Sequence, residues 1–245
     1  MWGAALVVAP AAAAGPELSV KPPLTAPATP EKRSGVLTLA GGAFAYLPKG
    51  LTAAPAPLLV YFYGAGGQPS DVLASLRADA DRDGFVLLIP TARGATWDMI
   101  LDLQGRLGIE MKVTPRYGRD LKALDLALTD IFARVAIDPA RVGVMGFSNG
   151  ATYAFSVGTA NPQLFGTVIA FSPGPAFLGR SDPAQRIFIS HGEDDEVLPF
   201  SYTRAIVGKL RVKKAMVTFE PFKGGHTVPK DVRAKALALF AAPKG

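Results

Sequence analysis

The residues best suited to covalent chemistry centre on one serine. The segment from Gly146 to Gly150 has the sequence G-F-S-N-G, so Ser148 lies in a G-x-S-x-G pattern. In this pattern the chain turns sharply from a strand into a helix, and the two glycines prevent clashes while the serine hydroxyl projects outward. An apolar segment precedes the pattern and a helical one follows it. We therefore predict that Ser148 is a nucleophile; the alternative is a glycine-rich turn with a passive serine.

A serine hydroxyl is hardly ionised at neutral pH, so it needs a base, and the base needs an acid that orients it. The only histidines of the chain are His191 and His226. His226 follows two glycines, and an acidic run at 193–196 precedes it. The chain order serine, acid, histidine predicts Asp195 as the acid and His226 as the base. His191 as the base and Asp194 as the acid remain open, as does a simple solvated loop.

Acyl transfer also requires backbone N–H groups that bind the oxygen on which negative charge develops. The amide of Asn149, directly after the serine, is one candidate. The second is the amide of Ala65, in the sequence G-A-G-G from Gly64 to Gly67, where the backbone can approach a substrate. The same glycines would also fit an ordinary tight turn between a strand and a helix.

These residues must be positioned by strands and helices that alternate along the chain. A continuous apolar run such as 58–63 is typical of a strand buried on both faces of a parallel sheet. The patterns predict an opening hairpin at 36–48, strands at 58–63, 85–90, 142–147, 167–171, 186–190 and 216–221, and helices at 70–82 (capped by Ser70), 121–135, 151–159, 202–210 and 229–240.

The alternation predicts an α/β fold with a mostly parallel central sheet and helices on both faces. Ligands of such sheets bind at the carboxyl ends of the strands. Ser148, Asp195 and His226 each follow a predicted strand, so we expect them at one edge of the sheet. Residues 91–118 are predicted to form a long irregular loop, and long loops in compact domains tend to be functional.

Composition narrows the chemistry further. The 245 residues are 49% hydrophobic and 19% charged, which is typical of a globular protein with one large core. The absence of cysteine excludes disulfides, thiolate metal sites and a cysteine nucleophile. Two histidines are too few for a multi-histidine metal site. We expect neither a metal nor another cofactor.

The net charge of +6 is unevenly distributed, since the residues from Arg204 onward include ten Lys/Arg and two Asp/Glu. Such a basic region would suit a nucleic acid if aromatic side chains were interleaved with it. Here the cations lie mainly on polar faces of predicted helices, so a solvated face is favoured and we expect no nucleic-acid partner. An anionic partner or membrane surface remains open. No apolar run reaches the ~18 residues of a spanning helix, so we expect no stable membrane insertion.

The N-terminal region has two parts. Residues 1–14 are almost wholly apolar and end in three alanines, which resembles a signal segment, although no basic residue precedes the apolar run. Residues 15–34 are rich in proline and alanine and are predicted to form an extended linker. A single domain would then span residues 35–242. The expected location is secreted or periplasmic, with a cytoplasmic location as the alternative; the oligomeric state is left open.

From about residue 35 to residue 240 the chain resembles the α/β-hydrolase superfamily, and more narrowly the bacterial phospholipase/carboxylesterase and dienelactone-hydrolase-like esterases. The resemblance rests on the serine pattern, on the string H-G-x-x-D-x-x-[VL]-P from His191 to Pro199, and on the G-G-H that ends at His226. It favours Asp195 over Asp194 as the acid. One departure is Tyr63-Gly64, where the family often has His-Gly before the oxyanion residue.

The resemblance implies a cofactor-independent serine carboxylic-ester hydrolase that acts on a small-molecule or lipid ester. It also implies that Trp97, in the sequence T-W-D from Thr96 to Asp98, lines the substrate pocket; loop packing is the alternative role. We expect Tyr63 to contact substrate as well. A thioesterase, a lysophospholipase, a polyester or aryl esterase or a peptidase with the same residues remains open. So does a non-catalytic binding protein with this fold.

Overall fold

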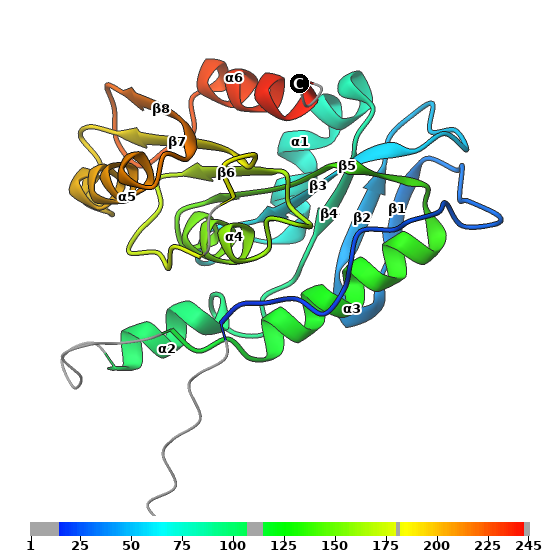
Figure 1. Ribbon diagram of the computed structural model, residues 1–245, viewed down its shortest axis with the longest axis horizontal. Helices are drawn as coiled ribbons and strands as arrows, with labels where there is room; N and C mark the ends of the chain where they lie inside the picture. Colours follow the sequence, from blue (N-terminus) through cyan, green and yellow to red (C-terminus); the bar gives the residue numbers. More distant parts are fainter. Residues whose placement is uncertain (1–14, 107–114, 180–181, 243–245) are drawn as a thin grey trace, which may run out of the picture.

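In the computed structural model, residues 15–106, 115–179 and 182–242 are described. Within these ranges eight strands form one sheet in the order β1-β2-β4-β3-β5-β6-β7-β8 (Figure 1). The possible signal segment, residues 1–14, lies outside the described residues. Among the described residues, no helix is both long enough and apolar enough to cross a bilayer.

The strands are β1 (Gly35–Thr38), β2 (Phe44–Leu47), β3 (Ala56–Phe62), β4 (Val86–Ile89), β5 (Ile137–Phe147), β6 (Thr167–Phe171), β7 (Arg186–Gly192) and β8 (Met216–Phe222). The helices are a 3-10 turn η1 (Ala40–Gly42), α1 (Pro69–Asp83), α2 (Asp98–Arg106), α3 (Arg119–Arg134), α4 (Asn149–Ala160), α5 (Phe200–Val212) and α6 (Lys230–Ala241).

The sheet confirms the predicted mixture of one hairpin and parallel strands. β1 and β2 pair antiparallel, and β2 joins the remaining strands through an antiparallel pairing with β4. From β4 to β8 every neighbouring pair is parallel. The carboxyl ends of β3, β5, β7 and β8 therefore lie at the same edge of the sheet, which is where the predicted site residues follow these strands.

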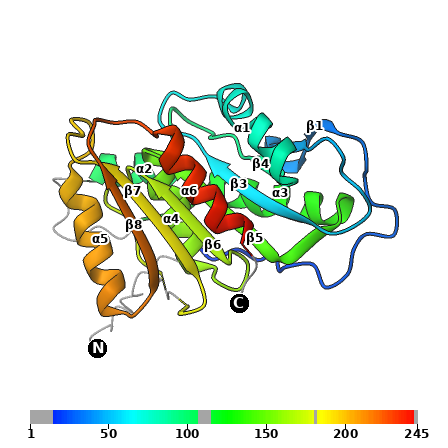
Figure 2. The ribbon, with the colours of Figure 1, turned by 90° about the horizontal axis from the view of Figure 1, so that it is seen from above.

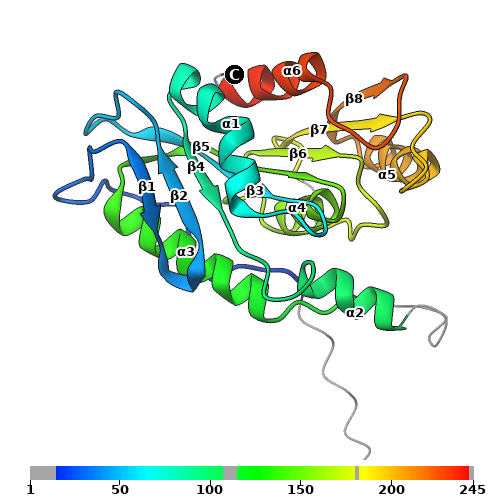
Figure 3. The ribbon, with the colours of Figure 1, turned by 180° about the vertical axis from the view of Figure 1, so that it is seen from behind.

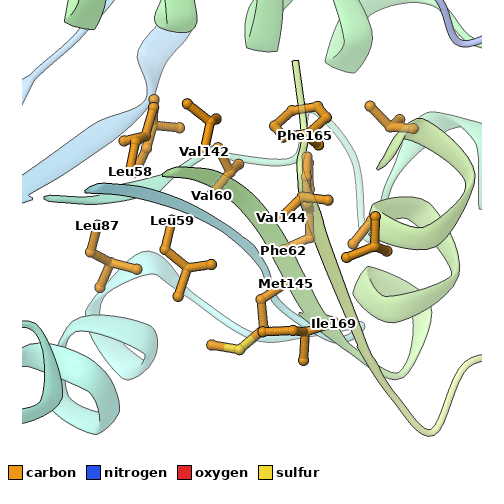
Figure 4. Close-up of a cluster of buried hydrophobic side chains, with 14 of the residues drawn as sticks. Leu58, Leu59, Val60, Phe62, Leu87, Val142, Val144, Met145, Phe165 and Ile169 are labelled. Atoms are coloured by element: carbon orange, nitrogen blue, oxygen red, sulfur yellow. The ribbon is translucent and has the colours of Figure 1, made fainter. Parts of the chain in front are cut away.

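Helices cover both faces of the sheet, as predicted. α1 and α6 lie on one face, whereas α3, α4 and α5 lie on the other (Figures 1 and 3). Seen from above, α6 crosses over the central strands (Figure 2). The strands between these layers are buried on both sides and carry the core: Leu59, Leu87 and Met145 project from one face and Val60, Phe62 and Val144 from the other (Figure 4).

Two local predictions were wrong. Residues 98–106 form α2 rather than irregular loop, because Met99 and Ile100 are buried and the amide of Ile100 donates to the carbonyl of Trp97, starting the helix. The cap of α1 is Gln68, not Ser70. Gln68 and Asp71 form a reciprocal capping box, so the helix begins one residue before Ser70.

The segment before β1 has no helix or strand and lies along α3 (Figure 1). It is fastened to the domain at several points. The side chain of Asn161, just after α4, accepts a hydrogen bond from the Leu18 amide at 2.8 Å and donates one to the Pro16 carbonyl at 2.7 Å. Asp125 on α3 accepts from the Val20 amide at 2.8 Å. Leu18 is buried, so this segment forms part of the domain surface.

Two glycines inside helices differ in the space around them, and the difference shows how closely α4 packs on the sheet. A Cβ atom at Gly158 in α4 would lie 2.7 Å from Val144 Cγ1 and from Val168 Cγ2, whereas a Cβ atom at Gly208 in α5 would have no neighbour within 4 Å. We expect Gly158→Ala to lower the free energy of unfolding by about 1–3 kcal/mol through overpacking. Gly208→Ala should raise it by up to about 1 kcal/mol, because alanine is the better helix former. Urea unfolding measures both, and equal effects would contradict the close α4 contact.

Candidate active site

The serine sits in a strained turn between β5 and α4. Ser148 has φ 57° and ψ −126°, a conformation that is rare for any residue other than glycine. A Cβ atom at Gly146 would lie 2.3 Å from the Gly150 carbonyl oxygen, and one at Gly150 would lie 2.1 Å from the Phe62 carbonyl oxygen. Both glycines are therefore sterically required. Ser148 is 9% exposed and lies directly before the N-terminus of α4.

The structure brings Ser148, His226 and Asp195 into one chain of hydrogen bonds. His226 Nε2 lies 2.9 Å from Ser148 Oγ, and His226 Nδ1 lies 2.7 Å from Asp195 Oδ2. Asp195 carries no proton-donating group when ionised, so Nδ1 donates and Nε2 is left to accept the serine proton. The His226 ring also contacts the ring of Phe147, with centroids 4.7 Å apart.

The Asp195 carboxylate is fully buried and heavily hydrogen-bonded. Its Oδ1 atom accepts from the amides of Val197 and Leu198, both at 2.9 Å, while Oδ2 faces His226. Burial acts to raise the pKa of Asp195. The hydrogen bonds from Leu198, His226 and Val197 outweigh burial, so the pKa lies below its ordinary value. The carboxylate is therefore charged at neutral pH and can stabilise a protonated His226.

Glycines bring the acid loop and the histidine loop together. A Cβ atom at Gly192, the last residue of β7, would lie 2.3 Å from the Gly224 carbonyl oxygen and 2.4 Å from that of Gly225. The amide of Asp194 donates to the Gly224 carbonyl at 3.0 Å. Gly192 of the H-G sequence is therefore sterically required, because a side chain there would overlap the two carbonyls before His226.

The rival assignments are not supported by the geometry. Asp194 is exposed, whereas Asp195 faces His226. His191 is fully buried and uses both ring nitrogens: Nδ1 lies 2.6 Å from Thr203 Oγ1, and Nε2 lies 2.9 Å from the Leu198 carbonyl. Nε2 also lies 3.2 Å from Asp195 Oδ2. Burial lowers the pKa of His191, so this imidazole is a neutral buttress of the acid loop.

The two candidate oxyanion amides come from segments that adjoin the serine. The amide of Asn149 is the first of α4, and the first amides of a helix have no partner within it. The Gly64–Gly67 turn lies against the serine, since a Cβ atom at Gly64 would be 3.2 Å from Ser148 Cβ. Within the described residues, neither the Ala65 amide nor the Asn149 amide donates a hydrogen bond. Their role as oxyanion donors therefore stays a prediction.

The two aromatic residues predicted to contact substrate have different surroundings. Tyr63 lines a pocket of about 230 Å³ together with Gly64, Ala65 and Phe147, next to the serine turn. Trp97 is 1% exposed and packs against Phe62 and Tyr153, so its ring is buried among other aromatic side chains. The 96–98 segment folds inward onto the end of β3, so the surroundings of Trp97 match its alternative role, loop packing.

The two neighbours of Trp97 in the chain form hydrogen bonds that no sequence pattern predicted. Asn149 Nδ2 donates to Thr96 Oγ1 at 3.3 Å. Asp98 and Asp120 cap each other's helices: the Asp98 amide donates to Asp120 Oδ2 at 2.7 Å, and the Asp120 amide donates to Asp98 Oδ2 at 3.0 Å. Burial raises the pKa of Asp120. The only sequence signal for these links is the compact T-W-D motif.

The model of the dienelactone hydrolase family matches residues 42–235, which includes every residue of the site described above. The chain belongs to the dienelactone hydrolase family. It is therefore a hydrolase with an α/β-hydrolase fold, which confirms the predicted superfamily and fold. No curated protein matches the sequence.

Several solved structures have a similar fold. The chain is similar to esterase PE8, with 21% identity, a TM-score of 0.57, and coverage of 84% of this chain and 96% of that one. A dienelactone hydrolase-like promiscuous phosphotriesterase from metagenomic libraries has 16% identity and a TM-score of 0.61, covering 85% and 95%. A fluorophosphonate-binding serine hydrolase of Staphylococcus aureus has 13% identity and a TM-score of 0.60, covering 86% and 98%. At these identities the likeness establishes the fold.

The lowered pKa of Asp195 predicts a pH-dependent stability. A carboxylate whose pKa is lower in the folded chain stabilises the fold above its unfolded pKa, and this contribution is lost as the pH falls through the folded pKa. We expect Asp195→Asn to lower the free energy of unfolding at pH 7, and the gap to wild type to narrow below about pH 4. Urea unfolding between pH 3 and 7 measures the gap.

The matched control is Asp194→Asn, which changes an exposed carboxylate next to Asp195 in the same loop. The difference in free energy of unfolding between this variant and wild type should be small and should not change with pH. A gap for Asp195→Asn that is the same at pH 3 and pH 7 would contradict the hydrogen-bonded, ionised state assigned to Asp195.

Proposed function

We propose that this chain is a cofactor-independent serine hydrolase that cleaves carboxylic esters through an acyl-enzyme on Ser148. The observation that carries the proposal is the continuous path from Ser148 Oγ to His226 Nε2, at 2.9 Å, and from His226 Nδ1 to Asp195 Oδ2, at 2.7 Å. Membership of the dienelactone hydrolase family supports ester chemistry. The acyl-enzyme and the roles of the three residues are the parts that experiment must test.

In the first half of the reaction, Ser148 Oγ attacks the ester carbonyl carbon and His226 Nε2 takes the serine proton. The carbonyl electrons move to oxygen, and the resulting oxyanion lies between the amides of Ala65 and Asn149. His226 then gives its proton to the leaving alcohol as the carbon–oxygen bond breaks. Asp195 holds the imidazole in one tautomer and stabilises its positive charge.

In the second half, water replaces the alcohol. His226 takes a proton from the water, the hydroxide attacks the acyl carbon, and the same two amides bind the second oxyanion. Collapse of this intermediate breaks the bond to Ser148 Oγ, which recovers its proton from His226. The carboxylic acid leaves and the enzyme is regenerated, without any group other than the protein and water.

The exposed serine variant Ser201→Ala provides a control for Ser148→Ala. With p-nitrophenyl acetate, butyrate and palmitate as substrates, Ser148→Ala should lose at least about 10⁴-fold in kcat, because the nucleophile is removed. Ser201→Ala should behave as wild type. The chain-length profile separates a small-ester enzyme from a lipase-like one. Equal turnover by wild type and Ser148→Ala would exclude Ser148 as the nucleophile.

A thioesterase, lysophospholipase or peptidase would use the same residues, so a panel of thioesters, lysophospholipids and peptides decides between them. A fluorophosphonate separates all of these from a non-catalytic binding protein. We expect one phosphonyl group per folded chain, attached at Ser148 and absent from Ser148→Ala. Failure of the folded wild type to react would favour the non-catalytic alternative.

A further inference from the structure

The indole of Trp97 donates a hydrogen bond to the residue that joins β3 to the candidate oxyanion turn. Its indole Nε1–H donates to the Tyr63 carbonyl oxygen at 2.8 Å. Trp97 is 1% exposed, and the indole is a donor with no acceptor function. The ring is fixed by Phe62 and Tyr153, whose centroids lie 4.8 and 5.4 Å from its own. The N–H group is therefore held in one direction, towards Tyr63.

The carbonyl that Trp97 binds lies at a critical position. Tyr63 precedes the Gly64–Gly67 turn, so its carbonyl belongs to the peptide unit directly before the one that carries the Ala65 N–H. On its other side this carbonyl abuts α4, since a Cβ atom at Gly150 would lie 2.4 Å from it. The peptide plane is thus clamped between the indole N–H and the first turn of the helix that follows Ser148.

The same short segment also contacts the side chain of Asn149, the residue that carries the second candidate backbone amide. Thr96 Oγ1, next to Trp97, accepts the hydrogen bond from the Asn149 side chain at 3.3 Å. The segment is itself fixed, because the Ala92 amide donates to the Tyr63 hydroxyl at 2.9 Å and Asp98 is held through the reciprocal caps with Asp120. Residues 92–98 therefore contact both segments that carry the candidate amides, at Tyr63 and at Asn149.

We propose that Trp97 is a positioning residue for the oxyanion hole: its indole N–H fixes the Tyr63 carbonyl and thereby aims the Ala65 amide at the developing oxyanion. This inference rests on the proposed esterase function. Hydrogen-bond donors accelerate acyl transfer when they are oriented before charge appears, and a misplacement of about 1 Å can cost about 10²-fold in rate. Loss of the N–H leaves the Ala65 amide present but less well fixed.

Trp97→Phe removes the N–H and keeps an aromatic ring in the buried site. With p-nitrophenyl acetate we expect kcat/KM per active site to fall about tenfold, less than the 10²–10³-fold loss typical when an oxyanion donor is deleted. The loss should fall on kcat, with KM within about twofold of wild type. Active sites are counted by fluorophosphonate titration, so a partly unfolded preparation does not lower the value.

A trifluoromethyl ketone tests the oxyanion hole directly. Ser148 Oγ adds to its carbonyl carbon, the serine proton passes to His226, and the ketone oxygen becomes an anion held by the two amides. We expect the inhibition constant of this ketone to rise in Trp97→Phe by the same factor by which kcat/KM falls. The inhibition constant of the acetate product, which needs no oxyanion hole, should change less than twofold.

Two further variants keep the test decisive. Tyr153→Phe alters the aromatic cluster around Trp97 but leaves the Tyr63 carbonyl bonded, so kcat/KM and the ketone affinity should stay within twofold of wild type. Trp97→β-(3-benzothienyl)alanine replaces N–H by sulfur in a ring of nearly the same shape. It should reproduce the loss seen in Trp97→Phe even if the phenylalanine variant folds poorly.

The positioning role is overturned if the benzothienyl variant retains wild-type kcat/KM, or if kcat/KM falls while the ketone affinity does not. These outcomes differ from failure of the esterase function itself. In that case wild type would neither react with the fluorophosphonate nor hydrolyse the ester, and no comparison among the Trp97 variants would arise.

Discussion

The backbone of Ser148 is held in a left-handed conformation, and much of the surrounding structure can be understood as what that conformation requires. The turn is possible only because Gly146 leaves room for the Gly150 carbonyl and Gly150 leaves room for the Phe62 carbonyl. The price is an approach of α4 to β3 so close that any side chain at Gly150 would overlap the Phe62 carbonyl. The same close approach places the Gly64–Gly67 turn against the serine. The packing of α4 on β3 therefore positions both the nucleophile and the candidate amides.

The acid and the base depend on a second close approach, between the loops after β7 and β8. Gly192 allows the two loops to touch, and Asp195 is then buried among two amides and two imidazoles. A buried carboxylate is stable as an anion only if such donors surround it. His191 contributes to this environment as a neutral ring, which explains why a second histidine lies so near the first without competing for the serine.

The sequence predicted those parts of the fold and site that depend on local patterns. Apolar runs located the parallel strands. The G-x-S-x-G motif located Ser148 because its two glycines are required sterically within the turn, and the G-G-H motif located His226. The supports beneath the site were missed because they join distant positions: Thr96 to Asn149, and Asp98 to Asp120. The periodicity of apolar residues does not reveal such pairs. Trp97 was assigned to the pocket because an aromatic residue in a loop gives no indication of whether it folds inward.

The hydrogen bonds of the N-terminal segment can form only late in synthesis of the chain. Leu18 and Pro16 are bound by Asn161, which lies 143 and 145 positions later in the chain. At about 5–20 residues per second, roughly 7–30 seconds separate the synthesis of the segment from that of its anchor. During this interval the segment cannot form its native hydrogen bonds to Asn161, so it stays accessible to other molecules while the rest of the domain is made.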